Sequence, residues 1–205
     1  LDSFKLIELS QERDPSPSSS GAVESEKGTV TFLNGASSSG KTTIAKKLQS
    51  ILSRTYLLVS IDGFMQQLPA GLDPKRLDKE LPVLLAGFSA SAAAMVREGN
   101  NIIVDHVLWQ QPWVLPCVEA YEGVDVVFVG IWCSLETLEA REEARGDRIQ
   151  GVARIQHEST HRNKTYDVEV DTSKMSVDEC ASAICEYIES RGEPEAFRKL
   201  GATEL

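Results

Sequence analysis

Residues 35–42 have the types and spacing of a phosphate-binding loop. They read GASSSGKT, with two glycines five positions apart and a lysine and a threonine after the second. Glycine lets the backbone turn tightly, which brings several N–H groups to face one point. Lys41 can reach the β- and γ-phosphates of a nucleotide, and Thr42 offers a hydroxyl group to Mg²⁺. The stretch therefore predicts a site for a nucleoside triphosphate.

The segments on either side of this loop fit the strand–loop–helix context that such a loop needs. Residues 30–33, VTFL, are typical of a buried strand, and residues 43–52 place apolar side chains on one side of a helix. A turn of small residues that matches the pattern by accident would lack this context. The predicted phosphate-binding residues are Gly35, Ala36, Ser37, Ser38, Ser39, Gly40, Lys41, Thr42 and Thr43.

Two aspartates follow apolar stretches at the ends of predicted strands. Asp62 follows YLLVSI, and Asp105 follows NNIIV. Because the carboxyl ends of parallel strands meet at one edge of a sheet, we expect both near the loop. Asp105 should then act on the Mg²⁺ side together with Thr42, and Asp62 should face the acceptor hydroxyl as a base. The alternative for either residue is a helix cap or a turn former.

Three arginines follow the fourth predicted strand. Arg141, Arg145 and Arg148 are spaced by four and three residues, so they can share one helix face until Gly146 interrupts it. In an acidic protein they suggest a clamp on transferring phosphates. The alternative is a solvated face that pairs with nearby acidic residues, and it is strongest for Arg141. These acidic residues are Glu136, Glu139, Glu142 and Glu143.

Aromatic side chains follow the same strand ends. Phe64 comes after Asp62, and His106, Trp109 and Trp113 come after Asp105. Aromatic residues in this position could form the wall of an organic substrate site. They could equally belong to the core.

The bulk composition limits the classes of partner. A net charge of −10 over 205 residues disfavours nucleic acid and anionic membrane surfaces as partners. No continuous apolar run reaches the ~18 residues of a membrane-spanning helix. The four cysteines lack CxxC spacing, which is typical of reduced thiols in a cytoplasmic protein and disfavours a structural metal site.

Alternating apolar strands and helices predict an α/β fold, a three-layer sandwich with a five-stranded parallel sheet and helices on both faces. Strands are predicted at 29–34, 56–61, 101–105, 124–132 and 167–171. Helices are predicted at 40–53, 73–98, 111–121, 134–145, 147–160 and 176–190. Residues 1–28 are rich in Ser, Pro and Glu and predict a flexible leader, 29–192 form the domain, and 193–205 are expected to be a polar tail.

Several motifs together resemble the chloramphenicol phosphotransferase family. They are FLNGASSSGKTTIAKKLQSIL, VSIDGFMQQLP, IIVDHV, REEARGDRIQGVARIQ, His161 and YDVEVDTS, and the resemblance covers roughly residues 29–190. The family are P-loop kinases similar in architecture to shikimate and adenylate kinases. The resemblance implies that Asp62 takes the proton of the acceptor hydroxyl, that the arginines up to Arg148 form a lid, and that Thr172 and Ser173 pass near the adenine.

The resemblance further implies a Mg²⁺- and ATP-dependent kinase of a small hydroxylated molecule, with an antibiotic of the chloramphenicol type favoured. The segment between Gln67 and Arg97 is shorter than that of the antibiotic kinase and chemically different. A sugar, a nucleoside or another hydroxylated metabolite therefore remains open as the acceptor. A different class of function is a nucleotide-binding regulatory module with little transfer activity.

Overall fold

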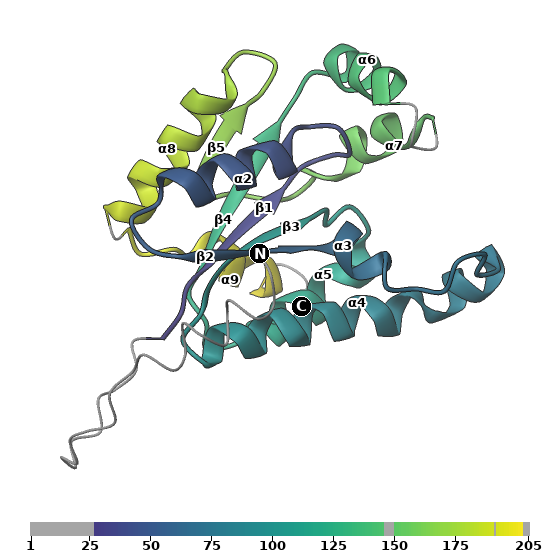
Figure 1. Ribbon diagram of the computed structural model, residues 1–205, viewed down its shortest axis with the longest axis horizontal. Helices are drawn as coiled ribbons and strands as arrows, with labels where there is room; N and C mark the ends of the chain where they lie inside the picture. The colour runs from purple at the N-terminus through teal and green to yellow at the C-terminus, as the bar shows by residue number, and fades with distance from the viewer. Residues whose placement is uncertain (1–26, 146–149, 191, 203–205) are drawn as a thin grey trace, which may run out of the picture.

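Five parallel strands lie between two layers of helices in the computed structural model, which describes residues 27–145, 150–190 and 192–202 (Figure 1). The strand order is β2-β3-β1-β4-β5, and neighbouring strands are parallel throughout. The strands are β1 (Val30–Asn34), β2 (Tyr56–Ser60), β3 (Asn101–His106), β4 (Val126–Trp132) and β5 (Val168–Asp171). The α/β fold with a five-stranded parallel sheet is therefore confirmed.

Helices cover both faces of this sheet, as parallel strands that are apolar on both faces require. Helices α2 and α8 pack on one face, and α4, α5 and α9 on the other, while α6 and α7 lie beyond the carboxyl ends of the strands (Figure 1). Short helix α3 follows β2. The helices are α2 (Lys41–Ile51), α3 (Ile61–Met65), α4 (Pro74–Arg97), α5 (Gln111–Ala120), α6 (Leu135–Arg145), α7 (Val152–Ser159), α8 (Val177–Glu189) and α9 (Ala196–Ala202).

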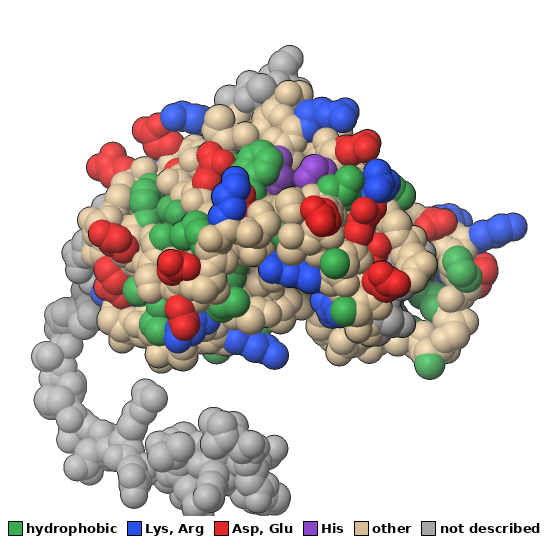
Figure 2. Space-filling view, turned by 90° about the horizontal axis from the view of Figure 1, so that it is seen from above, with side chains coloured by type: hydrophobic (Ala, Val, Ile, Leu, Met, Phe, Trp, Pro, Cys, Tyr) green, Lys and Arg blue, Asp and Glu red, His purple; other side chains and the backbone are tan. Residues whose placement is uncertain are grey.

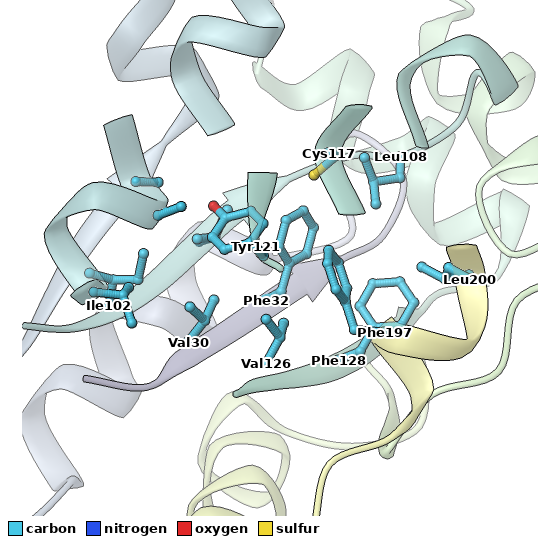
Figure 3. Packing of buried hydrophobic residues seen from close by; sticks show 14 of the residues in the cluster. Val30, Phe32, Ile102, Leu108, Cys117, Tyr121, Val126, Phe128, Phe197 and Leu200 are labelled. Atoms are coloured by element: carbon cyan, nitrogen blue, oxygen red, sulfur yellow. The ribbon is translucent and has the colours of Figure 1, made fainter. Parts of the chain in front are cut away.

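The expectation of a polar tail at 193–205 is wrong for its described part. Helix α9 inserts Phe197 and Leu200 into the core beside Phe32 and Phe128 (Figure 3). The carboxylate of Asp167 accepts the backbone N–H groups of residues 195 and 196, which fixes the start of this helix. Its few apolar positions have helical spacing, but charged neighbours hide them in the composition of the segment.

Other boundaries also differ from the sequence prediction, among them the start of the domain and the end of β2. Gly28 belongs to the domain and not to the leader, because it is buried and its N–H donates to the carbonyl of Val96. Residues 1–26 of the expected leader lie outside the described residues. Strand β2 ends at Ser60, whose side chain caps the unpredicted helix α3, so that Asp62 lies in the first turn of a helix and not at a strand tip.

Helix α4 is, within the described chain, long and apolar enough by composition alone to span a membrane. Charged residues near both ends of the helix keep its continuous uncharged stretch below ~18 residues, so no spanning helix was expected from the sequence. One side of the helix, including Phe88, Ala92 and Val96, is buried in the core against β3. Contact with the sheet thus explains part of the apolar composition of α4, because 33% of its most apolar window is buried.

Candidate active site

Local backbone geometry explains the residue types of the loop between β1 and α2. Gly40 has a φ of 94° and Ser38 a φ of 64°, both in the left-handed region. At Gly35 a Cβ atom would lie 2.6 Å from the carbonyl oxygen of Ile131 on β4. Non-glycine residues such as Ser38 rarely adopt positive φ, so the backbone at Ser38 is strained. Strained backbone of this kind is common at binding sites.

Lys41 opens helix α2 and folds back over the loop. Its Nζ donates to the carbonyl oxygens of Gly35 at 2.8 Å and Ala36 at 2.9 Å. The ammonium group is therefore held at the mouth of the loop, where it can meet the phosphates of a nucleotide. Ser37, Ser38, Gly40 and the first residues of α2 line the cavity in front of the loop, whereas Ser39 is buried behind it.

Thr42 and Asp105 meet beside the loop, as the sequence predicted. The Thr42 hydroxyl donates to Asp105 Oδ2 at 2.5 Å, and the parallel register places Asp105 opposite Leu33 near the end of β1. Mg²⁺ at nucleotide sites is usually held by one or two protein oxygens together with phosphates and water. Among the described residues no group of three or more His, Cys, Asp or Glu side chains could hold a metal alone. The pair Thr42 and Asp105 fits a Mg²⁺ ion that arrives with the nucleotide.

Arg141 connects α6 to the loop and to the end of β5. Its guanidinium donates to the Thr172 hydroxyl and carbonyl, both at 3.1 Å, and to the carbonyl of Ser38 at 3.4 Å. The Thr172 hydroxyl in turn donates to the carbonyl of Ser39 at 2.9 Å. The described contacts of Arg141 are thus with the loop, with Cys133 after β4 and with Thr172 after β5, so the alternative of a solvated, glutamate-paired face does not apply to it.

Of the other two predicted arginines, the structure describes one. Arg145 is exposed and lines the same cavity as Arg141. Arg148 lies outside the described residues.

Glu142 has a role that the sequence analysis missed. It was considered only as an ion-pair partner for the arginines, but it is 4% exposed and its carboxylate accepts the N–H groups of Gly151 and Ala153. It therefore caps the start of α7, where four N–H groups lack partners within the helix. A second link between α6 and α7 is the ion pair of Arg154 with Glu139, at 2.6 Å.

Gln156 is a second residue that was missed, although it is the final letter of REEARGDRIQGVARIQ, one of the motifs quoted above. It lies on α7, is 7% exposed, and lines the cavity. Its Oε1 accepts the backbone N–H of Ser37 at 2.6 Å. Its place in the motif could have singled it out, but its partner lies 119 positions away in the sequence.

A cavity of about 670 Å³ joins these groups at the carboxyl edge of the sheet. The phosphate loop and the start of α2 form one wall, and α6, α7 and the turn before α8 form another. Asp62 and His106 complete the lining near the end of β3. Lys41, Arg141 and Arg145 thus share one cavity with Asp62 and Asp105. Acidic and basic side chains are also intermixed on the molecular face shown in Figure 2.

His106 is a neutral group in this cavity. Burial, followed by the charge of Lys41, lowers the pKa of His106 to about 3, while Asp62 opposes the shift. The ring lies against Phe32 and Phe88, and its Nδ1 is buried without a hydrogen-bond partner among the described residues. At neutral pH the imidazole can therefore donate or accept a hydrogen bond but carries no charge.

Outside the phosphate loop, three predicted contact residues are not among the described residues that line the cavity: Phe64, Trp109 and Ser173. Within the loop, Gly35, Ala36 and Ser39 do not line it either. Phe64 packs edge-on against Phe88 at 5.6 Å between ring centroids, and Trp109 packs against Trp113 at 5.6 Å. The alternative of a packing role therefore accounts better for both rings. Ser173 is exposed and donates from its hydroxyl and N–H to Asp171, which closes a turn after β5.

Comparison with known proteins identifies the family of this chain. The sequence profile of the chloramphenicol phosphotransferase-like protein family matches residues 28–189. A Mycobacterium tuberculosis protein named "Putative O-phosphotransferase" is 32% identical over 198 residues, which cover 85% of this chain and 88% of the relative. The chain belongs to the chloramphenicol phosphotransferase-like family of P-loop small-molecule kinases.

Solved structures support the same fold. The APS kinase of Mycobacterium tuberculosis in complex with AMPPNP and APS matches with a TM-score of 0.63 at 19% identity, over 80% of this chain and 98% of that one. The shikimate kinase of Acinetobacter baumannii in complex with shikimate matches with a TM-score of 0.57 at 15% identity, over 80% and 95% of the two chains. At these identities the matches show the P-loop kinase fold.

Proposed function

We propose that this protein transfers the γ-phosphate of ATP to a hydroxyl group of a small molecule. The observation that carries the proposal is that a phosphate loop and an exposed carboxylate, Asp62, line one cavity. A site that only binds nucleotide has no need of a carboxylate across from the phosphates, and this disfavours a purely regulatory module. The APS kinase that shares the fold was captured with a nucleotide analogue and a second ligand together, which agrees with a two-substrate cavity.

The nucleotide end of the cavity would bind ATP through the loop N–H groups, Lys41 and Arg141. Mg²⁺, held beside the loop by Thr42 and Asp105, would neutralise negative charge on the phosphates. Thr172 is held by Arg141 and lines the cavity next to the loop, which supports a place near the base or the ribose. These residues bind and orient the nucleotide, and phosphoryl transfer depends mainly on such positioning and charge neutralisation.

The acceptor end would supply the nucleophile. The acceptor oxygen forms a bond to the γ-phosphorus while the bond between that phosphorus and the oxygen bridging to ADP breaks, and the hydroxyl proton passes to Asp62. Lys41 and Arg145 reach the same cavity and would neutralise the charge that develops on the leaving phosphate. Asp62 is an exposed carboxylate that lines the cavity, so it is the base that the geometry supports best.

Family membership favours an antibiotic of the chloramphenicol type as the acceptor, and such an activity would give resistance by modification. A sugar, a nucleoside or another hydroxylated metabolite is the second candidate, because the segment from 67 to 97 differs from the antibiotic kinase. In the structure this segment holds the loop after α3 and helix α4, next to Asp62.

A mass-shift screen tests the proposal. The protein is incubated with ATP and Mg²⁺ and, one at a time, with chloramphenicol, other hydroxylated antibiotics, sugars and nucleosides. The expected result is the gain of one phosphoryl group by a hydroxylated compound, together with the formation of ADP, and its loss in Asp62→Asn. Binding of ATP with no phosphorylated product across the panel, and equal ATP consumption by both variants, would favour the regulatory module.

A further inference from the structure

The side-chain amide of Gln156 has a fixed orientation at the edge of the cavity. Its partner, the backbone N–H of Ser37, can only donate a hydrogen bond, so the atom that faces it at 2.6 Å must be the amide oxygen. The Nε2 group of Gln156 is therefore turned away from the loop backbone. The choice between oxygen and nitrogen, which is often ambiguous for glutamine, is settled here by the partner.

This Nε2 group has no hydrogen-bond partner among the described residues, and it is not one of their fully buried unpartnered atoms. Since Gln156 is 7% exposed and lines the cavity, the exposed part of its side chain faces that space. An amide NH₂ provides two donors and no charge. The cavity therefore contains a neutral donor beside the middle of the phosphate loop, in addition to its cationic groups.

The position of Gln156 is held from both sides, which a ligand-binding group requires. Glu142 fixes the start of α7 through Gly151 and Ala153, and Ala153 is fully buried in one hydrophobic cluster with Ala36 of the loop. Donors that are fixed before the ligand arrives lose little freedom on binding, so they contribute more to affinity and to charge stabilisation.

We infer that Gln156 is a phosphate-binding residue whose Nε2 donates to an oxygen of the γ-phosphate, while its Oε1 anchors the loop at Ser37. The inference rests on the proposed function, because it takes ATP as the ligand of the loop. A γ-phosphate oxygen is an acceptor, which matches an NH₂ group. Gln156 also lies on α7, which packs on α6, and would thereby connect Arg141 and Arg145 of α6 to the group being transferred.

Two variants separate the two ends of this amide. Gln156→Glu keeps an oxygen that can accept the N–H of Ser37 but replaces the donor with a negative acceptor. Gln156→Met removes both. Gln150→Glu is the matched control, because it adds the same charge close to the start of α7 at an exposed residue that does not line the cavity.

The experiment measures the dissociation constants of AMPPNP and of ADP, each with Mg²⁺, by calorimetry, with melting temperatures as the folding control. Gln156→Glu should weaken AMPPNP at least about 10-fold more than ADP, as expected for losing a hydrogen bond to a charged group. Gln156→Met should reduce the preference for AMPPNP in the same direction, and Gln150→Glu should leave the ratio of the two constants unchanged.

If the ratio of the two constants is the wild-type value in both Gln156 variants, the residue only anchors the loop and the inference is wrong. The same conclusion follows if Gln150→Glu shifts the ratio as far as Gln156→Glu. No acceptor is needed for this measurement, so its outcome is independent of the mass-shift screen. Failure of the proposed function would instead appear as an absence of phosphorylated product in the wild-type protein.

Discussion

The two ends of the cavity differ in how firmly the fold holds their side chains. At the nucleotide end, Lys41, Thr42 and Arg141 each make hydrogen bonds to neighbouring groups, and Gln156 anchors the loop itself. At the acceptor end, Asp62 is exposed and lies on a five-residue helix, α3, that has no buried residue.

This difference matches the two tasks of a small-molecule kinase. Neutralising the phosphates is a task common to kinases that use ATP, and it gains most from groups that are fixed in advance. Recognition of the acceptor differs between kinases with different acceptors, and under the proposed function it would depend on groups near Asp62. The reaction class can therefore be argued from the nucleotide end, while the identity of the acceptor has to come from experiment.

Lys41→Ala should have the largest effect. Removing one fixed donor to a developing negative charge costs ~10²–10³-fold in turnover, so transfer to the acceptor found in the mass-shift screen should fall by at least this factor. The melting temperature should stay near that of the wild type, because Lys41 contacts the loop and not the core. Lys46→Ala, an exposed position on the same helix, is the control and should keep full activity. Near-normal turnover in Lys41→Ala would remove the basis of the proposed function.

Asp62→Asn should lower transfer by ~10²-fold, as expected for the loss of a general base. ATP affinity should hardly change, because Asp62 belongs to the acceptor end. Asp105→Asn should instead shift the Mg²⁺ concentration needed for half-maximal rate. Asp125→Asn, at an exposed aspartate just before β4 that does not line the cavity, is the control for the loss of one negative charge. The opposite pattern, in which Asp62→Asn shifts the Mg²⁺ requirement and Asp105→Asn does not, would reverse the two roles.

Arg141→Lys should raise the KM for ATP by about 10-fold with a smaller change in kcat. A lysine keeps the charge but loses the planar fork that contacts both the hydroxyl and the carbonyl of Thr172. Ser173→Ala is the matched control, since Ser173 was predicted to bind nucleotide but contacts only its own turn. A larger rise in KM for Ser173→Ala than for Arg141→Lys would restore the sequence-based assignment.

The sequence predicts those parts of the fold and the site whose signal is local. The phosphate loop is one continuous motif, and Asp105 follows its apolar strand directly, so the contact with Thr42 could be expected. Gln156 and Glu142 could not be assigned, because their roles depend on backbone N–H groups of other elements. Phe64 follows a strand, and an aromatic residue in this position fits the core and a cavity wall equally well. Its contact with Phe88, a residue of α4, decides for the core.

The smallest effect on the rate is expected from the titration of His106, which lies near Asp62 in the cavity lining. Because the pKa of His106 lies near 3, this side chain stays neutral over about pH 5 to 8, where an ordinary histidine changes its charge. The rate of transfer should therefore not change between pH 5 and pH 8 because of His106. The pH–rate profiles of the wild type and of His106→Asn should have the same shape in this range. A step near pH 6.5 that His106→Asn removes would show that the imidazole is solvated and charged in the working enzyme.

The same burial makes a prediction for stability, with a definite sign. The unfolded chain protonates His106 as the pH falls below 6.5, whereas the folded protein does so only near pH 3. The unfolded state then binds more protons, so the free energy of unfolding should decrease between these values, by about 2 kcal/mol at pH 5. Urea unfolding at pH 8 and pH 5 measures the change. In His106→Asn, the free energy of unfolding should fall less between pH 8 and pH 5. Part of the fall should persist, because burial also lowers the pKa of His161, to about 4. An unchanged decrease in His106→Asn would show that His106 contributes nothing to it.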